Sequence, residues 1–105
     1  MKVCFYLSSS RKSPVEEFLN EQSSEIQSDF VDAVNLLALG KRLSMPLSRN
    51  LSSIYPGLHE LRLKDKSGNV RIFYFIQKGK GIYLLHAMKK KTQELDVDFI
   101  ESRPL

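Results

Sequence analysis

The hydrophobic positions of the first part of the chain change from a strand pattern to a helix pattern. The segment from Lys2 to Leu7 is rich in Val, Phe and Tyr, which favours a strand. Residues 13–16 read Ser-Pro-Val-Glu. This is typical of a helix start, because Ser13 can accept a bond from a free backbone amide, proline suits the first helical position, and Glu16 can reach back to the cap. We predict a short helix from Pro14 to about Glu21.

A second, longer helix is predicted to begin at Ser24 and to end at Gly40. Residues 24–27 (Ser-Glu-Ile-Gln) repeat the capping pattern, and glycine is a common residue just after a helix. The hydrophobic residues between them recur with a period of 3.6 and form one face: Ile26, Phe30, Ala33, Val34 and Leu37. We interpret this face as core and not as a cofactor site.

The pattern changes to a period of two in the second half. Residues 41–57 contain two prolines and four serines without a sustained period, so we predict a loop with at most a short turn at 47–51. Three strand-like runs follow, Leu58 to Leu63, Val70 to Gln77 and Gly81 to Met88. The glycine-containing segments between them suit tight hairpins. The order β-α-α-β-β-β predicts one α+β domain over residues 1–105, with two helices on an antiparallel sheet of about four strands.

Composition narrows the functional classes. The chain has 105 residues, which fits a single domain. Its first apolar run is too short for a signal sequence, and no segment has the roughly 18 apolar residues of a membrane span, so we expect a soluble cytoplasmic protein. Cys4 is the only cysteine and lies in an apolar run, which favours a small buried side chain. No cysteine cluster suggests a metal site, and we expect no metal or cofactor.

Charge is concentrated in one part of the sequence. The formal charge is only +4, but residues 58–91 carry nine basic residues against two acidic ones. The tail from Thr92 carries one basic residue and four acidic ones. This distribution favours a polyanion or an acidic partner, although a charged stretch is also the ordinary form of a solvated face.

Two arginines on neighbouring predicted strands are candidates for phosphate binding. If Arg62 and Arg71 lie side by side, their guanidinium groups form the kind of surface that binds phosphate. Alternatively, Arg71 pairs with Glu60 across the hairpin and the pair is structural. The roles of the two histidines also stay open. His59 fits the edge of the core, and His86 fits either a structural or a proton-transfer role.

Three motifs together resemble a known family. They are residues 58–62 (Leu-His-Glu-Leu-Arg), residues 70–75 (Val-Arg-Ile-Phe-Tyr-Phe), and residues 83–92, which end in Lys-Lys-Lys-Thr. In this order they resemble the phage-derived Gp49-like, HigB-type branch of the RelE/ParE toxin superfamily. The resemblance implies two helices on an antiparallel sheet, and cleavage of messenger RNA on the translating ribosome. It also implies a cognate HigA-like antitoxin with a helix-turn-helix domain, which neutralises the toxin.

The resemblance also suggests roles for individual residues. The family's basic positions fall on Arg62, Arg71 and the lysines after the last strand. We predict Arg62, Arg71 and Lys90 as the catalytic cations that stabilise charge developing on phosphorus. The RNA-binding set that we predict is Lys64, Lys89, Lys91, Tyr74 and His86, where Tyr74, His86 or a lysine also supplies proton transfer.

Two features depart from the family, and two other functions stay open. Residues 94–105 are short and acidic where relatives continue into a longer helix, so we assign no residue here to a catalytic group that relatives carry on that helix. No histidine and carboxylate pair is evident as acid and base. The same fold also suits a ParE-like inhibitor of DNA gyrase, and the basic strands alone suit an RNA-binding module without catalysis.

Overall fold

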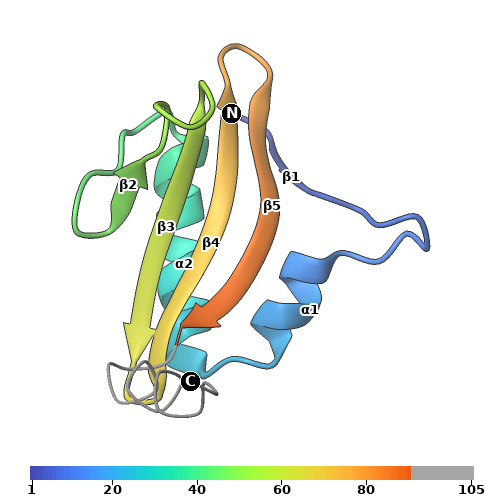
Figure 1. Ribbon diagram of the computed structural model, residues 1–105, viewed down its shortest axis with the longest axis vertical. Coiled ribbons are helices and arrows are strands. Elements are labelled where there is room, and N and C mark those ends of the chain that lie inside the picture. Colours follow the sequence, from blue (N-terminus) through green and yellow to red (C-terminus); the bar gives the residue numbers. More distant parts are fainter. Residues whose placement is uncertain (91–105) are drawn as a thin grey trace, which may run out of the picture.

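One sheet and two helices make up the part of the chain that the computed structural model describes, residues 1–90. In Figure 1, α2 crosses behind the sheet and α1 lies beside the lower half of β5. The elements are β1 (Val3–Phe5), α1 (Pro14–Asn20), α2 (Ser24–Ala38), β2 (Ser48–Asn50), β3 (Leu58–Asp65), β4 (Gly68–Gln77) and β5 (Gly81–Lys90). The predicted α+β class is confirmed.

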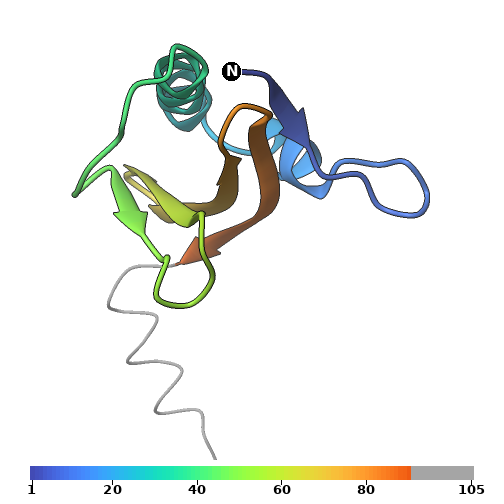
Figure 2. The same ribbon diagram turned by 90° about the horizontal axis from the view of Figure 1, so that it is seen from above.

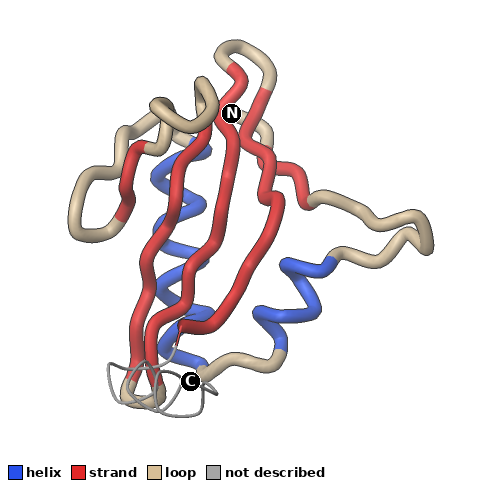
Figure 3. The backbone as a smooth tube through the Cα atoms, in the orientation of Figure 1, coloured by secondary structure: helices blue, strands red, loops and turns tan. Residues whose placement is uncertain are grey.

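The sheet has five strands in the order β1-β5-β4-β3-β2 (Figure 3). Adjacent strands from β2 to β5 pair antiparallel, whereas β1 pairs parallel with β5. The sheet is therefore mixed, whereas we predicted a wholly antiparallel one. Strand β2 lies within the segment that we predicted to be a loop. It is only three residues long and pairs with residues 59–61 of β3, too short a run for a period of two to be recognised.

Both helices begin with a serine cap. The Glu16 amide donates to Ser13 Oγ at 3.2 Å, which confirms the predicted start of α1. For α2 the cap is Ser23 and not Ser24, because Ser23 Oγ accepts from the Ile26 amide at 3.2 Å. Gly40, just after α2, has a φ of +82°, a left-handed conformation that glycine adopts without strain.

The core lies between the helices and one face of the sheet, which we call the inner face. In the view from above, α2 lies on one side of the sheet (Figure 2). The predicted hydrophobic face of α2 supplies four buried residues, while Val34 is only partly buried. The core residues are Val15, Leu19, Ile26, Phe30, Ala33, Leu37, Leu61, Leu63, Val70, Ile72, Tyr74, Ile82 and Leu84. The opposite face of the sheet, the outer face, is covered by neither α1 nor α2.

An irregularity in the pairing of β4 with β5 changes which residues of β5 lie on each face. Phe73 pairs with His86 but Tyr74 pairs with Leu84, so Leu85 is an extra residue without a partner on β4. Beyond it the alternation is reversed, which puts Ala87 against the core and leaves His86 exposed. His86 therefore lies on the face opposite Leu84, whereas an uninterrupted period of two along residues 81–88 would put both on one face.

The start of α2 is tied to the β3–β4 hairpin through Asp65. Ser23 Oγ donates to one oxygen of Asp65 at 2.7 Å. The amide and hydroxyl of Ser67 donate to the other oxygen at 2.9 and 2.8 Å. These hydrogen bonds, helped by the charge of Lys89, lower the pKa of Asp65 to about 2.

We expect Asp65→Asn to lower the free energy of unfolding at pH 6 but not near pH 2. Because the folded protein lowers the pKa of Asp65 from 3.8 to about 2, its ionised form contributes stability that is complete above the ordinary pKa and is lost as the pH falls towards 2. Urea unfolding at pH 6 and near pH 2 measures the difference between wild type and variant. Asp32→Asn, on an exposed part of α2, is the control. An Asp65→Asn difference that is the same at both pH values would contradict the linkage.

Candidate nucleic-acid interface

The candidate site lies on the outer face, where side chains from β3, β4 and β5 meet. Arg62 of β3 and Arg71 of β4 are directly opposite each other in the pairing of the two strands. The hairpin positions them, because Asp65 pairs with Gly68 and leaves only two residues in the turn. The length of the turn therefore fixes the strand register that places the two arginines opposite each other.

Both arginines share one carboxylate. Arg71 Nη1 lies 3.2 Å from Glu60 Oε2, and Arg62 Nε lies 3.6 Å from Glu60 Oε1. The alternatives that the sequence left open are thus both present: Arg71 pairs with Glu60, and it also lies beside Arg62. Two guanidinium charges against one carboxylate leave an excess positive charge at this point of the sheet.

The hydrogen-bonding capacity of this cluster is only partly used. Glu60 is 4% exposed, yet its Oε1 has no hydrogen-bond donor within the described residues. The Nε of Arg71 is buried and also lacks an acceptor there. Each guanidinium carries five N–H groups, so after the contacts to Glu60 several donors of Arg62 and Arg71 stay available for the oxygens of an anion.

A groove of about 370 Å³ lies over the arginine pair. Its volume lies near the lower end of the range of small-ligand sites. Lys64, predicted to bind RNA, is exposed and lines the same groove, so the structure brings Lys64, Arg62 and Arg71 together. The lining residues are Pro46, Leu47, Arg62, Leu63, Lys64, Asn69 and Arg71.

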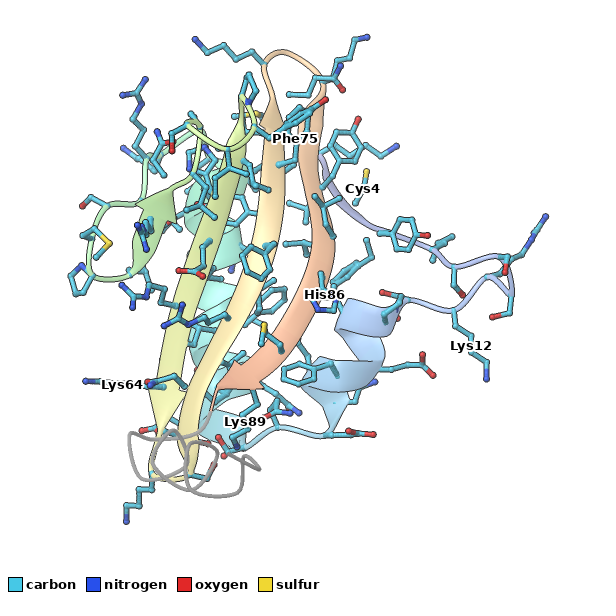
Figure 4. The ribbon with its side chains drawn as sticks, viewed as in Figure 1. Cys4, Lys12, Lys64, Phe75, His86 and Lys89 are labelled. Atoms are coloured by element: carbon cyan, nitrogen blue, oxygen red, sulfur yellow. The ribbon has the colours of Figure 1, made fainter. Side chains whose placement is uncertain are left out.

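His86 lies on the same outer face, one pair of residues along from the arginines. It is exposed and stacks on Phe73, with ring centroids 6.3 Å apart and an angle of 21° between the rings. Arg71 pairs with Met88 and Phe73 pairs with His86, so the imidazole neighbours the groove on the β5 side. Figure 4 shows His86 on β5, between the labelled Phe75 and Lys89.

Tyr74, by contrast, is not on this face. Its side chain is 1% exposed on the inner face, and its hydroxyl lies 2.6 Å from Ser48 Oγ. Burial raises the pKa of the Tyr74 phenol, and the bond to Ser48 opposes that rise. His59 stacks on Tyr74 at 5.1 Å, which agrees with a position at the edge of the core. The prediction that Tyr74 contacts RNA is therefore wrong: Tyr74 is three positions from Arg71, and an odd spacing on a regular strand puts two side chains on opposite faces.

We expect Tyr74→Phe to reduce stability and not RNA chemistry. The change removes a buried hydrogen bond and leaves the Ser48 hydroxyl, which is 2% exposed, without that partner. A loss of about 1 kcal/mol in the free energy of unfolding follows, measured by urea denaturation. A phenylalanine variant of unchanged stability, or one whose only defect is in RNA cleavage, would refute this assignment.

The lysines at the end of β5 do not all lie where we predicted them. Lys89 pairs with the buried Val70 and so lies on the inner side of the sheet, where its Nζ donates to Ser67 Oγ. Lys89 is not among the residues that line the groove. Lys90 pairs through its backbone with Asn69, but its side chain lies outside the described residues, as does the whole of Lys91.

Some parts of the site carried no usable signal in the sequence. Pro46 and Leu47 form one wall of the groove, but they lie in the segment predicted to be a loop. Glu60 was considered as a partner of Arg62 on the surface or of Arg71 across the hairpin, and it contacts both arginines. Strands flank Glu60 on both sides, because Arg49 of β2 and Phe73 of β4 are its pairing partners.

Two other kinds of site are absent from residues 1–90. No helix there is long and apolar enough to cross a membrane. Over the same residues, no three histidine, cysteine or carboxylate side chains are grouped so that they could hold a metal ion.

The fold and the outer face together define a RelE-like α+β domain. The chain belongs to the family of phage-derived Gp49-like proteins (DUF891), whose model matches residues 17–102. This is a family of RelE/HigB-like toxins, so the resemblance of the three motifs is confirmed. The family indicates a toxin of a toxin–antitoxin system, with an antitoxin as its partner. A search of curated proteins finds no match to the chain.

Proposed function

We propose that this toxin is an endoribonuclease that cleaves messenger RNA on the translating ribosome. The observation that supports the proposal is the placement of Arg62 directly opposite Arg71, over a single carboxylate and beside Lys64 in one groove. Cations held at fixed positions stabilise a phosphorane-like transition state, because they need no reorganisation as negative charge develops.

In the proposed reaction the RNA supplies its own nucleophile. The 2′-hydroxyl loses its proton and its oxygen forms a bond to the adjacent phosphorus, while the bond from phosphorus to the 5′-oxygen breaks. The products are a 2′,3′-cyclic phosphate and a 5′-hydroxyl, whose proton comes from water. Arg62 and Arg71 bind the non-bridging oxygens. His86 accepts the proton of the 2′-hydroxyl, a role supported by its exposure on the same face.

The lysines and the partner complete the proposal. Lys64 binds a flanking phosphate, which makes RNA affinity fall with salt. Lys90 is retained as a third catalytic cation on the strength of the motif alone, and Lys91 as a phosphate contact. The antitoxin that we propose is HigA-like, with a helix-turn-helix domain.

The decisive experiment is to induce the protein in a bacterial host and to map new 5′ ends on messenger RNA. We expect cuts in coding regions with wild type and with Lys78→Ala, a cation at the far hairpin, but none with Arg71→Ala. A reporter without a start codon should escape cutting, because it is not translated. Growth arrest with intact messages would indicate inhibition of gyrase instead, and binding to RNA without arrest or cuts would indicate a non-catalytic module.

A further inference from the structure

A second groove, of about 620 Å³, lies towards the other end of the sheet and is almost wholly apolar. Its walls come from β1 and the residue after it, from the loop before β3, and from β4 and β5. They include Phe5, Tyr6, Tyr55, Phe75, Tyr83 and Leu85. Tyr55 is 61% exposed and Tyr6 is 53% exposed. Exposed apolar side chains gathered in one hollow form a candidate interaction site.

The groove is preformed by backbone packing. Phe75 contacts Tyr55 edge-on at 6.0 Å between ring centroids and lies 6.4 Å from the ring of Tyr83. Gly57 brings the loop against Phe75, because a Cβ at this position would lie 2.7 Å from the phenylalanine ring. The Ile76 amide also donates to Gly57 O at 3.0 Å. A partner therefore loses little affinity to ordering of these walls.

The apolar groove continues towards the arginine groove along β3. Leu58 lines the first and Arg62 lines the second, and the two residues are four positions apart on the same strand. This spacing corresponds to about 13 Å. In Figure 4, Phe75 and Lys64 lie towards opposite ends of the sheet, so one bound segment can reach from the apolar end to the basic end.

The geometry points to a polypeptide segment of the antitoxin as the occupant: an apolar anchor fills the Tyr55–Phe75–Tyr83 groove, and a carboxylate of the same segment reaches Arg62 and Arg71. An extended segment needs its acidic residue about four positions from the anchor, and a helical one about nine. The excess positive charge around Glu60 makes the acidic residue complementary. This surface is independent of whether the arginine groove cleaves RNA.

The lining favours a protein over RNA. Within residues 1–90, the walls contain no charged side chain and one side-chain amide, that of Gln77, so these residues supply no cation to bind the phosphate of each successive nucleotide. Leu58 and Leu85 contribute aliphatic surface, which packs against leucine or phenylalanine better than it stacks with a base.

The test uses the whole chain and the product of the adjacent reading frame, co-expressed and then titrated by calorimetry. We expect Tyr55→Ser and Leu85→Ser each to weaken the complex by at least about 30-fold and to lose neutralisation, as central apolar contacts do. Leu39→Ser is the matched control, because Leu39 is 74% exposed just beyond α2 and outside the groove. Thermal unfolding checks that all three variants fold.

The possible results separate this proposal from the one on RNA cleavage. Wild-type affinity in both groove variants, or no complex with the adjacent product, overturns the docking surface. Groove variants that bind the antitoxin normally but no longer cut messenger RNA assign the groove to RNA and also overturn it. If wild type cuts no RNA at all, the nuclease proposal fails, while the binding measurements still decide whether the groove holds the antitoxin.

Discussion

Arg71→Ala should lower the rate of messenger RNA cleavage by about 100- to 1,000-fold, with a smaller effect on binding of the message. Removal of one preformed cation at a developing oxyanion has an effect of this order. Arg71→Lys should recover only part of the rate, because lysine offers a point charge without the two-pronged geometry that Arg71 presents beside Arg62. Single-turnover cleavage in a reconstituted translation reaction measures the rate directly.

A double variant that carries both Arg71→Ala and Arg62→Ala tests whether the two arginines act on the same phosphate. If both arginines act on the same phosphate, removing the second should cost much less than removing the first. Lys78→Ala is the control for loss of positive charge, and unfolding curves establish that each variant is folded. Full activity in Arg71→Ala, or independent and additive losses in the two arginine variants, would argue against a shared phosphate site.

Glu60→Gln should lower the free energy of unfolding by about 2 kcal/mol and raise the affinity for anions. Loss of one member of a buried ion pair is strongly destabilising, but the side chains of Arg62 and Arg71 are 34% and 21% exposed, so solvent screens part of the cost. Without the carboxylate, the two guanidinium groups repel each other and bind an anion more tightly.

Sulfate provides the measurement that separates these effects. At matched ionic strength, replacing chloride with sulfate should raise the melting temperature of Glu60→Gln more than that of wild type, because a bound anion stabilises the folded state. Glu21→Gln, an exposed carboxyl at the end of α1, should respond like wild type. An equal response of all three proteins would mean that Glu60 does not compete with an anion for the arginines.

The parts of the fold that local sequence determines were predictable. Serine caps and a hydrophobic period of 3.6 define both helices, although the cap of α2 is one residue earlier than predicted. The period of two defines β3 to β5. Strand β2 and the parallel pairing of β1 depend on contacts between distant segments, and each strand has only three residues, which is too few for a pattern.

The candidate site was predictable to the extent that it lies on β3 and the first half of β4. Arg62, Arg71 and Lys64 share the groove because the hairpin alternates regularly on both sides of its turn. Tyr74 was assigned to RNA from the motif alone, although its odd spacing from Arg71 puts it on the opposite face of a regular strand. Lys89 was misplaced because three successive lysines offer no contrast between faces.

The extra residue at Leu85 has a consequence for comparing relatives of this toxin. One residue more or less in a strand reverses the alternation beyond it. Every later residue then lies on the other face of the sheet, even where its identity still matches. A related chain can therefore match this one through the final His-x-Met-Lys run and still direct its histidine into the core, if it lacks the insertion before it. Transfer of a surface role between relatives requires agreement in strand phase as well as in sequence.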